Sequence, residues 1–222
     1  MRLKMAAIVA GVIMMASTAW AGTLNYNFSA GLSGQQGTSL SYTQGGYTIT
    51  AYGYQVGQPG NTPEDLYVKT SGGDESGLGL ANEYDHEIES NQFVQLNLTN
   101  LVTAGMTNGD LTIGSVQSGE GYSICTSSAL GTLGNCPSSG DGQLNDQAFS
   151  VSWSASDPYL SIRGWVPPDG NSKANVLVMD FSTSAPTSDT PEPASLALMG
   201  TGLLCVAFAY RRLRSESPAK AK

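Results

Sequence analysis

Short alternations of apolar and polar residues recur along the middle of the chain, separated by turns rich in Gly, Asn and Ser. A period of two places apolar side chains on one face of a β-strand, so each run predicts a half-buried strand. Residues 175–181 are apolar on both faces and predict a central strand. The alternating runs lie at residues 24–28, 47–51, 94–98, 111–113, 149–153 and 160–162, with a further candidate at 122–125.

These runs predict an all-β domain over residues 22–181, an antiparallel β-sandwich or jelly roll. The pattern has no repeat of fixed length, which argues against a propeller or a β-helix. Residues 182–190 are polar and contain Ser, Thr and Pro, so they are expected to form a linker. Residues 194–210 carry no charge, and this length predicts one C-terminal transmembrane helix.

The N-terminus has the three parts of a secretory signal peptide. Two basic residues come first, residues 5–16 are apolar, and Ala19 and Ala21 occupy the small positions of an A-x-A site. Cleavage is therefore expected after Ala21, with residues 1–21 as the signal peptide. This pattern predicts that the rest of the chain is exported.

The segment between the two ends, residues 22–190, is strongly acidic. It has 16 acidic residues but only three basic ones, Lys69, Arg163 and Lys173, which gives a formal charge of −13. A nucleic-acid partner requires Lys and Arg to neutralise its phosphates, so nucleic-acid binding is excluded. An acidic surface suits an exported protein or one that attracts cations.

Cys125 and Cys136 lie at the two ends of a loop rich in Gly, Ser and Thr. In an oxidising compartment, such a pair is most simply a disulfide. A metal site would need two further ligands of a suitable type, and the sequence does not supply them nearby. The sequence therefore predicts a Cys125–Cys136 disulfide.

The tail contains a Pro-Glu-Pro triplet, an uncharged run and a cluster of arginines, in that order. This order over residues 191–214 resembles the PEP-CTERM sorting signal of Gram-negative bacteria, a tail also catalogued as the ice-binding protein C-terminal domain. The resemblance implies that an exosortase, a membrane-embedded protease, recognises and processes the tail. The residues implied in recognition are Pro191, Glu192, Pro193, Arg211, Arg212 and Arg214.

The same resemblance implies a destination in the cell envelope or in an exopolysaccharide matrix. Basic residues that flank a membrane span stay on the cytoplasmic side. Residues 215–222 are therefore expected to be a cytoplasmic tail, and the β domain is expected to lie outside the cytoplasm until processing releases it. The name of the tail is no evidence that this domain binds ice, because the tail occurs with many different domains.

Catalytic chemistry is hard to find in this sequence. His86 is the only histidine, and no motif for a nucleophile, a nucleotide or a redox cofactor occurs. The protein is therefore not expected to be an enzyme. Two acidic segments offer oxygen ligands for Ca²⁺ but lack EF-hand spacing, and solvated loops are the alternative. Their candidate ligands are Glu83, Asp85, Glu87 and Glu89 in one segment, and Asp141, Asn145 and Asp146 in the other.

Three aromatic residues are candidates for stacking against sugars. Tyr52 and Tyr54 share the more polar face of one expected strand, and Trp165 is expected in a nearby loop. Ordinary exposed tyrosines are the alternative. The favoured function is a non-catalytic structural or polysaccharide-binding module. A glycan hydrolase acting through two carboxylates and a calcium-dependent adhesin are the alternatives.

Overall fold

The computed structural model describes residues 22–57, 60–136, 145–165, 174–186 and 192–215. Residues Gly22–Pro186 form one compact unit, which contains all the strands described below. Helix α3 (Glu192–Ser215) belongs to the other unit.

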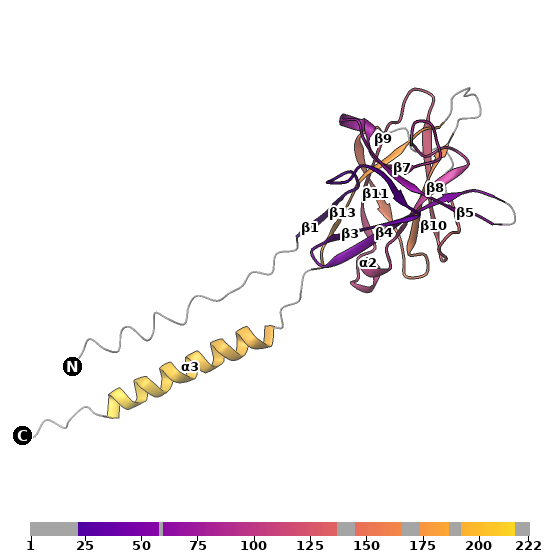
Figure 1. Cartoon of the computed structure of the whole chain (residues 1–222). Coiled ribbons are helices and arrows are strands. Elements are labelled where there is room, and N and C mark those ends of the chain that lie inside the picture. The colour runs from indigo at the N-terminus through magenta and orange to yellow at the C-terminus, as the bar shows by residue number, and fades with distance from the viewer. Residues whose placement is uncertain (1–21, 58–59, 137–144, 166–173, 187–191, 216–222) are drawn as a thin grey trace, which may run out of the picture. The chain divides into compact units, whose positions relative to one another are not determined.

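Two antiparallel sheets make up the β domain (Figure 1). Sheet A contains β1 (Thr23–Asn27), β2 (Gly34–Gly37), β6 (Leu66–Thr70), β7 (Ser76–Leu80), β9 (Asn108–Gly114), β11 (Gln147–Ser152) and β13 (Leu177–Ser184). Sheet B contains β3 (Ser39–Gln44), β4 (Tyr47–Gln55), β5 (Thr62–Glu64), β8 (Gln92–Asn97), β10 (Gly121–Ser127) and β12 (Tyr159–Trp165). Two short helical turns, η1 (Gly73–Glu75) and α2 (Thr99–Thr103), connect strands.

From β7 to β13, the chain pairs with itself like one long hairpin. Strand β7 pairs with β13, β8 with β12, and β9 with β11. Two further pairings connect these pairs within the sheets: β13 pairs with β9 in sheet A, and β12 pairs with β10 in sheet B. Successive strands in this region alternate between sheets A and B, which is the nested arrangement of a jelly roll. The predicted all-β sandwich is therefore confirmed.

The apolar half of each alternation packs between the two sheets. The core includes Tyr26, Leu96 and Phe181, all essentially without solvent exposure. The Trp153 ring lies 5.4 Å from the Phe181 ring, measured between centroids. These contacts explain why the period-two pattern identified strands, since removing apolar surface from water is the main favourable term in folding.

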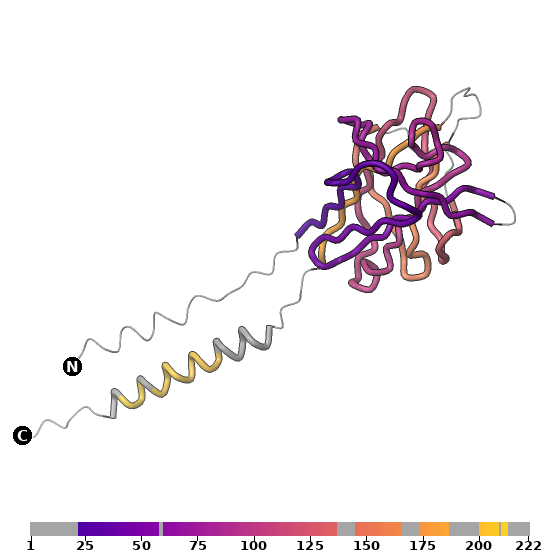
Figure 2. The backbone as a smooth tube through the Cα atoms, in the orientation of Figure 1, coloured from indigo at the N-terminus to yellow at the C-terminus, as the bar shows by residue number. Residues whose placement is uncertain are grey.

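Strand β13 is a central strand, as its two-sided apolar pattern predicted, but it extends further than expected. It continues to Ser184, which pairs with Thr23 of β1. The expected linker therefore does not begin at residue 182, because residues 182–184 form ladder hydrogen bonds. In Figure 2, the indigo start of the described domain runs beside the orange strand β13.

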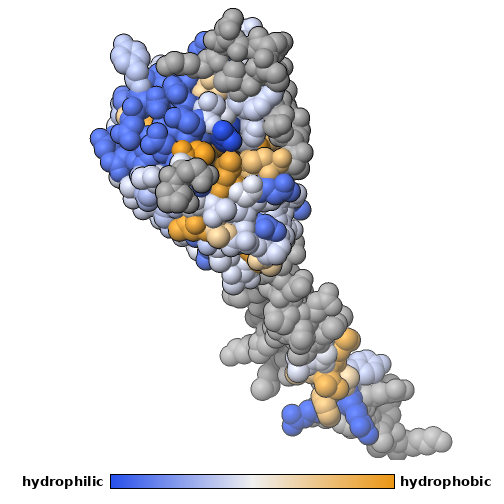
Figure 3. All heavy atoms as spheres, turned by 90° about the vertical axis from the view of Figure 1, so that its right-hand side faces the viewer, coloured by the Kyte–Doolittle hydropathy of each residue, from blue (hydrophilic) through white to orange (hydrophobic). Residues whose placement is uncertain are grey.

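Strands β2, β3, β5 and β6 were not among the predicted runs. The sequences GQQG of β2 and TPE of β5 give no apolar alternation. The sequences SLSYTQ of β3 and LYVKT of β6 do alternate, and these two strands were missed. The face of the domain in Figure 3 is largely hydrophilic, with smaller hydrophobic patches, as its acidic and polar composition leads one to expect.

Candidate functional site

The residues of the predicted sorting signal lie in and just before helix α3. Glu192 and Pro193 open this helix, while Pro191 lies outside the described residues. Proline is well tolerated there because the first N–H groups of a helix have no intrahelical acceptor. The arginines lie near the other end of α3, at positions Arg211, Arg212 and Arg214.

The expected signal peptide, with Ala19 and Ala21, lies outside the described residues. Among the helices in the part of the chain that the structure describes, none is both long enough and apolar enough to cross a membrane.

The predicted disulfide between Cys125 and Cys136 is present. The loop that it closes folds over the outer face of sheet B and bonds to the buried side chain of Gln95. The Gly131 amide donates to Gln95 Oε1 at 2.7 Å, and Gln95 Nε2 donates to the Thr132 carbonyl at 2.9 Å. The disulfide thus closes a loop that covers part of the outer face of sheet B.

This loop makes Tyr54, one of the residues predicted to stack against sugars, inaccessible. Tyr54 lies under the loop near Gly131, is 8 % exposed and stacks on Phe93 at a centroid distance of 5.1 Å. The expectation that Tyr54 is exposed is therefore wrong. Tyr52 is half-buried on the same strand, and Trp165 ends strand β12 instead of lying in a loop. The described structure does not bring the three rings together as one open platform.

The acidic side chains of the run 83–89 are not all left to solvent, because several of them have partners within the domain. Glu87 is 3 % exposed and forms an ion pair with Lys69, whose Nζ also lies 2.7 Å from Glu75 Oε2. The Ser115 hydroxyl lies 2.8 Å from the Glu87 carboxylate and 2.9 Å from that of Glu75. Burial raises the pKa of Glu87, whereas the hydrogen bond from Lys69 lowers the pKa of Glu75.

Glu83 faces another buried cluster. The Gln92 amide donates to both oxygens of Glu64 at 3.0 and 3.1 Å, and to Glu83 at 2.8 Å. Burial raises the pKa of Glu64. Burial, followed by the nearby charge of Glu89, raises the pKa of Glu83. The carboxyl groups of Glu64 and Glu83 therefore share Gln92 as their hydrogen-bond donor, and Glu83 also interacts with Glu89.

Asp85 has a different partner from Glu83 and Glu87, since it accepts a hydrogen bond from the Asn175 amide at 2.6 Å. The four acids at 83, 85, 87 and 89 therefore do not converge on one point. Within the described ranges, no group of three or more His, Cys, Asp or Glu side chains is placed to hold a metal ion.

The second predicted calcium segment is only partly described, because Asp141 lies outside the described residues. Asn145 donates to Asp74 at 2.7 Å and accepts from the Val116 amide at 2.9 Å. Asp146 is exposed on the neighbouring turn. Asn145 thus connects loops of the domain through its side chain.

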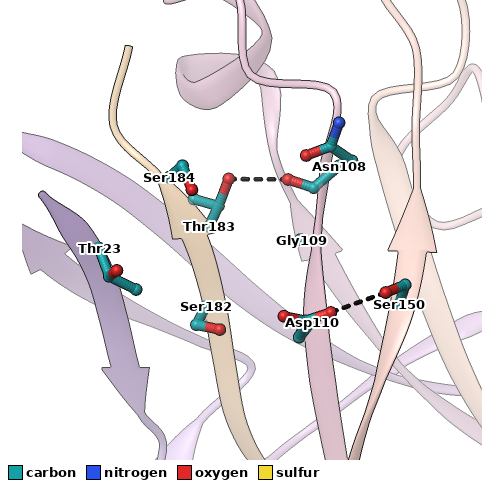
Figure 4. A pocket seen from close by; sticks show the side chains of 8 residues that line it. All are labelled: Thr23, Asn108, Gly109, Asp110, Ser150, Ser182, Thr183 and Ser184. Carbon is teal, nitrogen blue, oxygen red and sulfur yellow. Dashed lines mark hydrogen bonds between the residues drawn. The ribbon is translucent and has the colours of Figure 1, made fainter. Parts of the chain in front are cut away.

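A shallow polar groove of about 360 Å³ lies on the outer face of sheet A. Strands β1, β13, β9 and β11 supply its walls and floor (Figure 4). Gly109 lies in its floor, where an added Cβ would lie 2.3 Å from the Ser182 carbonyl oxygen. We refer to this site as the polar groove. Its lining residues are Thr23, Asn108, Gly109, Asp110, Ser150, Ser182, Thr183 and Ser184.

The hydrogen bonds of the polar groove leave many of its polar atoms free for a ligand. The Ser150 hydroxyl donates to Asp110 Oδ1 at 2.9 Å, and Thr183 donates to the Asn108 carbonyl at 2.8 Å (Figure 4). Thr183 is buried and fixes strand β13 against β9. Among the described residues, no hydrogen bond engages the side chains of Ser182 or Ser184.

The polar groove was not predicted from the sequence, because the apolar half of each alternation identifies a strand but not its polar neighbours on other strands. The polar half carries the signal: β1 alternates Thr23, Asn25 and Asn27 with buried residues, and β13 places Ser182 and Ser184 outward. Such outward rows are recognisable in sequence only once the strands that share a sheet are known.

Comparison with known proteins identifies the tail. The family model of the PEP-CTERM protein-sorting motif matches residues 189–212. No curated protein and no solved structure matches the chain. The resemblance of the tail is therefore confirmed, and the chain carries a PEP-CTERM sorting motif.

Proposed function

We propose that this protein is exported, that an exosortase recognises and processes its tail, and that the β domain then acts as a non-catalytic structural or polysaccharide-binding module. The match to the PEP-CTERM motif at residues 189–212 carries the proposal. That motif directs an exported chain to a membrane-anchored sorting step. The motif begins only three residues after the compact β domain ends at Pro186, so a cut near residues 191–193 would release the whole domain.

Before processing, the uncharged run 194–210 holds the protein in the membrane, and Arg211, Arg212 and Arg214 stay on its cytoplasmic side. The signal peptide, residues 1–21, is removed by cleavage after Ala21. The released domain enters the cell envelope or the exopolysaccharide matrix of a Gram-negative bacterium.

A non-catalytic role for the domain is favoured by the burial of two of its carboxyl groups, those of Glu64 and Glu87. A glycosidase needs two carboxyl groups that reach the scissile bond. Glu64 and Glu87 are 4 % and 3 % exposed, and each is engaged by a buried side chain. These carboxyl groups support the fold, and a sugar cannot reach them. We propose no cofactor for the domain.

The intact mass of the protein from its own host tests the sorting step. With a working exosortase, the expected mass corresponds to a chain that begins at residue 22 and ends near Pro191–Pro193. Without the exosortase, or with Glu192→Ala, we expect the tail to remain. Glu216→Ala is the matched control, because it removes an acid of the tail outside the motif. Equal retention of the tail in all strains would refute processing.

Sedimentation tests the role of the domain separately. The mature protein is expected to sediment with the exopolysaccharide of its host but to release no reducing ends from it. Release of reducing ends would favour the hydrolase.

A further inference from the structure

We propose that the polar groove binds a neutral polysaccharide through hydrogen bonds and excludes acidic polysaccharides. This inference rests on the proposed function, because it assigns a place and a ligand class to polysaccharide binding by the β domain. The polar groove takes the place of Tyr52 and Tyr54 as the proposed sugar-binding site, because Tyr54 is buried.

The lining of the polar groove favours a hydroxyl-rich ligand. Hydroxyl groups come from Thr23, Ser150, Ser182 and Ser184, and Asp110 adds a carboxylate. Asp110 accepts one hydrogen bond from Ser150, which uses part of its capacity, because an ionised carboxylate offers about four acceptor positions. Neutral sugars present closely spaced hydroxyl groups, which both donate and accept. Each polar group of the groove can therefore find a partner on such a ligand.

The strand register arranges these groups in a row. Three groove residues, Ser182, Asp110 and Ser150, pair across β13, β9 and β11. Asn25 of β1, which is not among the lining residues, pairs with Ser182 and extends this outward row to a fourth strand. Neighbouring strands lie about 4.8 Å apart, so the row is about 14 Å long. A row of this length contacts several sugar rings of an extended chain, whereas a single sugar would use only part of it.

The charges around the polar groove determine which polysaccharides it accepts. Strands β1, β9, β11 and β13 contain no Lys or Arg, while Asp110 and Asp180 both lie on their outer face. A carboxylate or sulfate group on the polymer would meet like charges without a cation to neutralise it. Acidic polysaccharides are therefore disfavoured.

A protein partner fits this surface less well. Cores of protein–protein interfaces are enriched in aromatic residues, Met and Arg, and their charged residues are depleted. The polar groove has none of the enriched types. Without aromatic stacking, each groove binds weakly, but a polymer that engages many copies of the protein gains avidity.

Affinity electrophoresis of the mature protein tests the proposal. Native gels contain dextran, galactomannan or xyloglucan as neutral probes, and alginate as the acidic probe. We expect retardation by at least one neutral probe and none by alginate. Asp110→Ala removes the central acceptor, and Ser182→Gln fills the groove with a longer side chain. Asp110→Ala is expected to weaken binding about tenfold, the loss that accompanies a hydrogen bond to a charged group. Ser182→Gln is expected to weaken binding because its longer side chain occupies the space of the ligand.

Asp65→Asn is the control variant, since it removes one negative charge outside the groove lining, where the Asp65 side chain accepts from Gln35. Its retardation should match that of the unaltered protein, and equal melting temperatures show that all variants fold. The groove proposal fails if both groove variants keep full retardation, if alginate retards the protein as strongly, or if no neutral probe does. Full retardation of the groove variants by a neutral probe would refute the groove alone. Failure to bind either the probes or the host exopolysaccharide would also refute the polysaccharide-binding role.

Discussion

The backbone amide of Ala185 donates a hydrogen bond of 2.8 Å to the carbonyl oxygen of Gly22. The two ends of the β domain are therefore fastened together, since β1 and β13 pair over their full shared length. The expected signal-peptide cleavage site immediately precedes Gly22, and the sorting motif begins at residue 189. Gly22 and Ala185, which lie at or next to the two ends of the β domain and near the proposed cleavage sites, are therefore neighbours.

Residues 22–186 should fold without either end of the chain. We expect a fragment of these residues to unfold in one cooperative transition, because it keeps both sheets and the core. Removing residues 22–27 as well deletes β1 and the buried side chains of Leu24 and Tyr26. This deletion should lower the free energy of unfolding by about 4 kcal/mol, from the lost apolar burial. Thermal unfolding followed by circular dichroism measures both, and equal stability of the two fragments would contradict the pairing.

Lys69→Met should be strongly destabilising. The substitution leaves the buried Glu87 carboxylate and its neighbour Glu75 without their cation. Breaking a buried pair on one side costs about 3 to 5 kcal/mol. The double variant with Glu87→Gln should recover part of the loss, because the uncompensated charge is gone. Urea unfolding measures both variants, and a Lys69→Met protein of normal stability would show that the pair contributes nothing.

The β domain should be more stable at pH 5 than at pH 8. Burial raises the pKa of Glu64, Glu87 and Glu120. Between the unfolded and the raised folded pKa, the folded state binds more protons, so stability falls as pH rises. Glu75 acts in the opposite sense, because its lowered pKa removes stability only as pH falls through that value.

Melting temperatures between pH 4.5 and pH 8 test this sign. Glu64→Gln should flatten the pH dependence, because a neutral amide replaces a titrating carboxyl group. A melting temperature that rises steadily over this range would show that the buried carboxyl groups do not dominate.

The disulfide should contribute to stability through the loop that it closes. Cys125 and Cys136 are 11 residues apart, and closing a loop of about this size stabilises by about 3 kcal/mol in the chain-entropy model. The double variant Cys125→Ser/Cys136→Ser should lose about this much in urea unfolding. Cys205→Ser is the control, because Cys205 is exposed and lies outside the β domain. A double variant with unchanged stability would contradict this account.

Tyr54 and Tyr52 should behave differently although they lie two residues apart on β4. Tyr54→Ala leaves a cavity between Phe93 and the disulfide loop, and should cost about 3 kcal/mol. Tyr52→Ala, at a half-buried position, should cost less than about 1 kcal/mol. Melting temperatures of the two variants measure the difference. Equal losses would mean that the loop does not cover Tyr54.

The sequence predicted most of the strands with regular apolar alternation, because a period of two is a local property of the chain. It did not reveal that Tyr54 is covered, since parity along β4 only assigns a side chain to a face. Whether that face is open depended on a loop more than seventy residues later. The acidic run 83–89 does not form the predicted calcium site, also because of contacts with segments outside the run. Strand β7 approaches it so closely that an added Cβ at Gly79 would lie 2.1 Å from the His86 carbonyl oxygen, and its acids take separate partners.

The sequence by itself determined the sorting tail, the disulfide pair, the acidic charge and the all-β class, because each depends on residue type, spacing or a short local period. Only the tertiary structure decided which carboxyl groups are buried and which polar residues share a surface. The row from Asn25 to Ser150 joins residues from four strands that are distant in the sequence. This row depends on strand order and register. Long-range packing determines both, and neither can be read from a local sequence pattern.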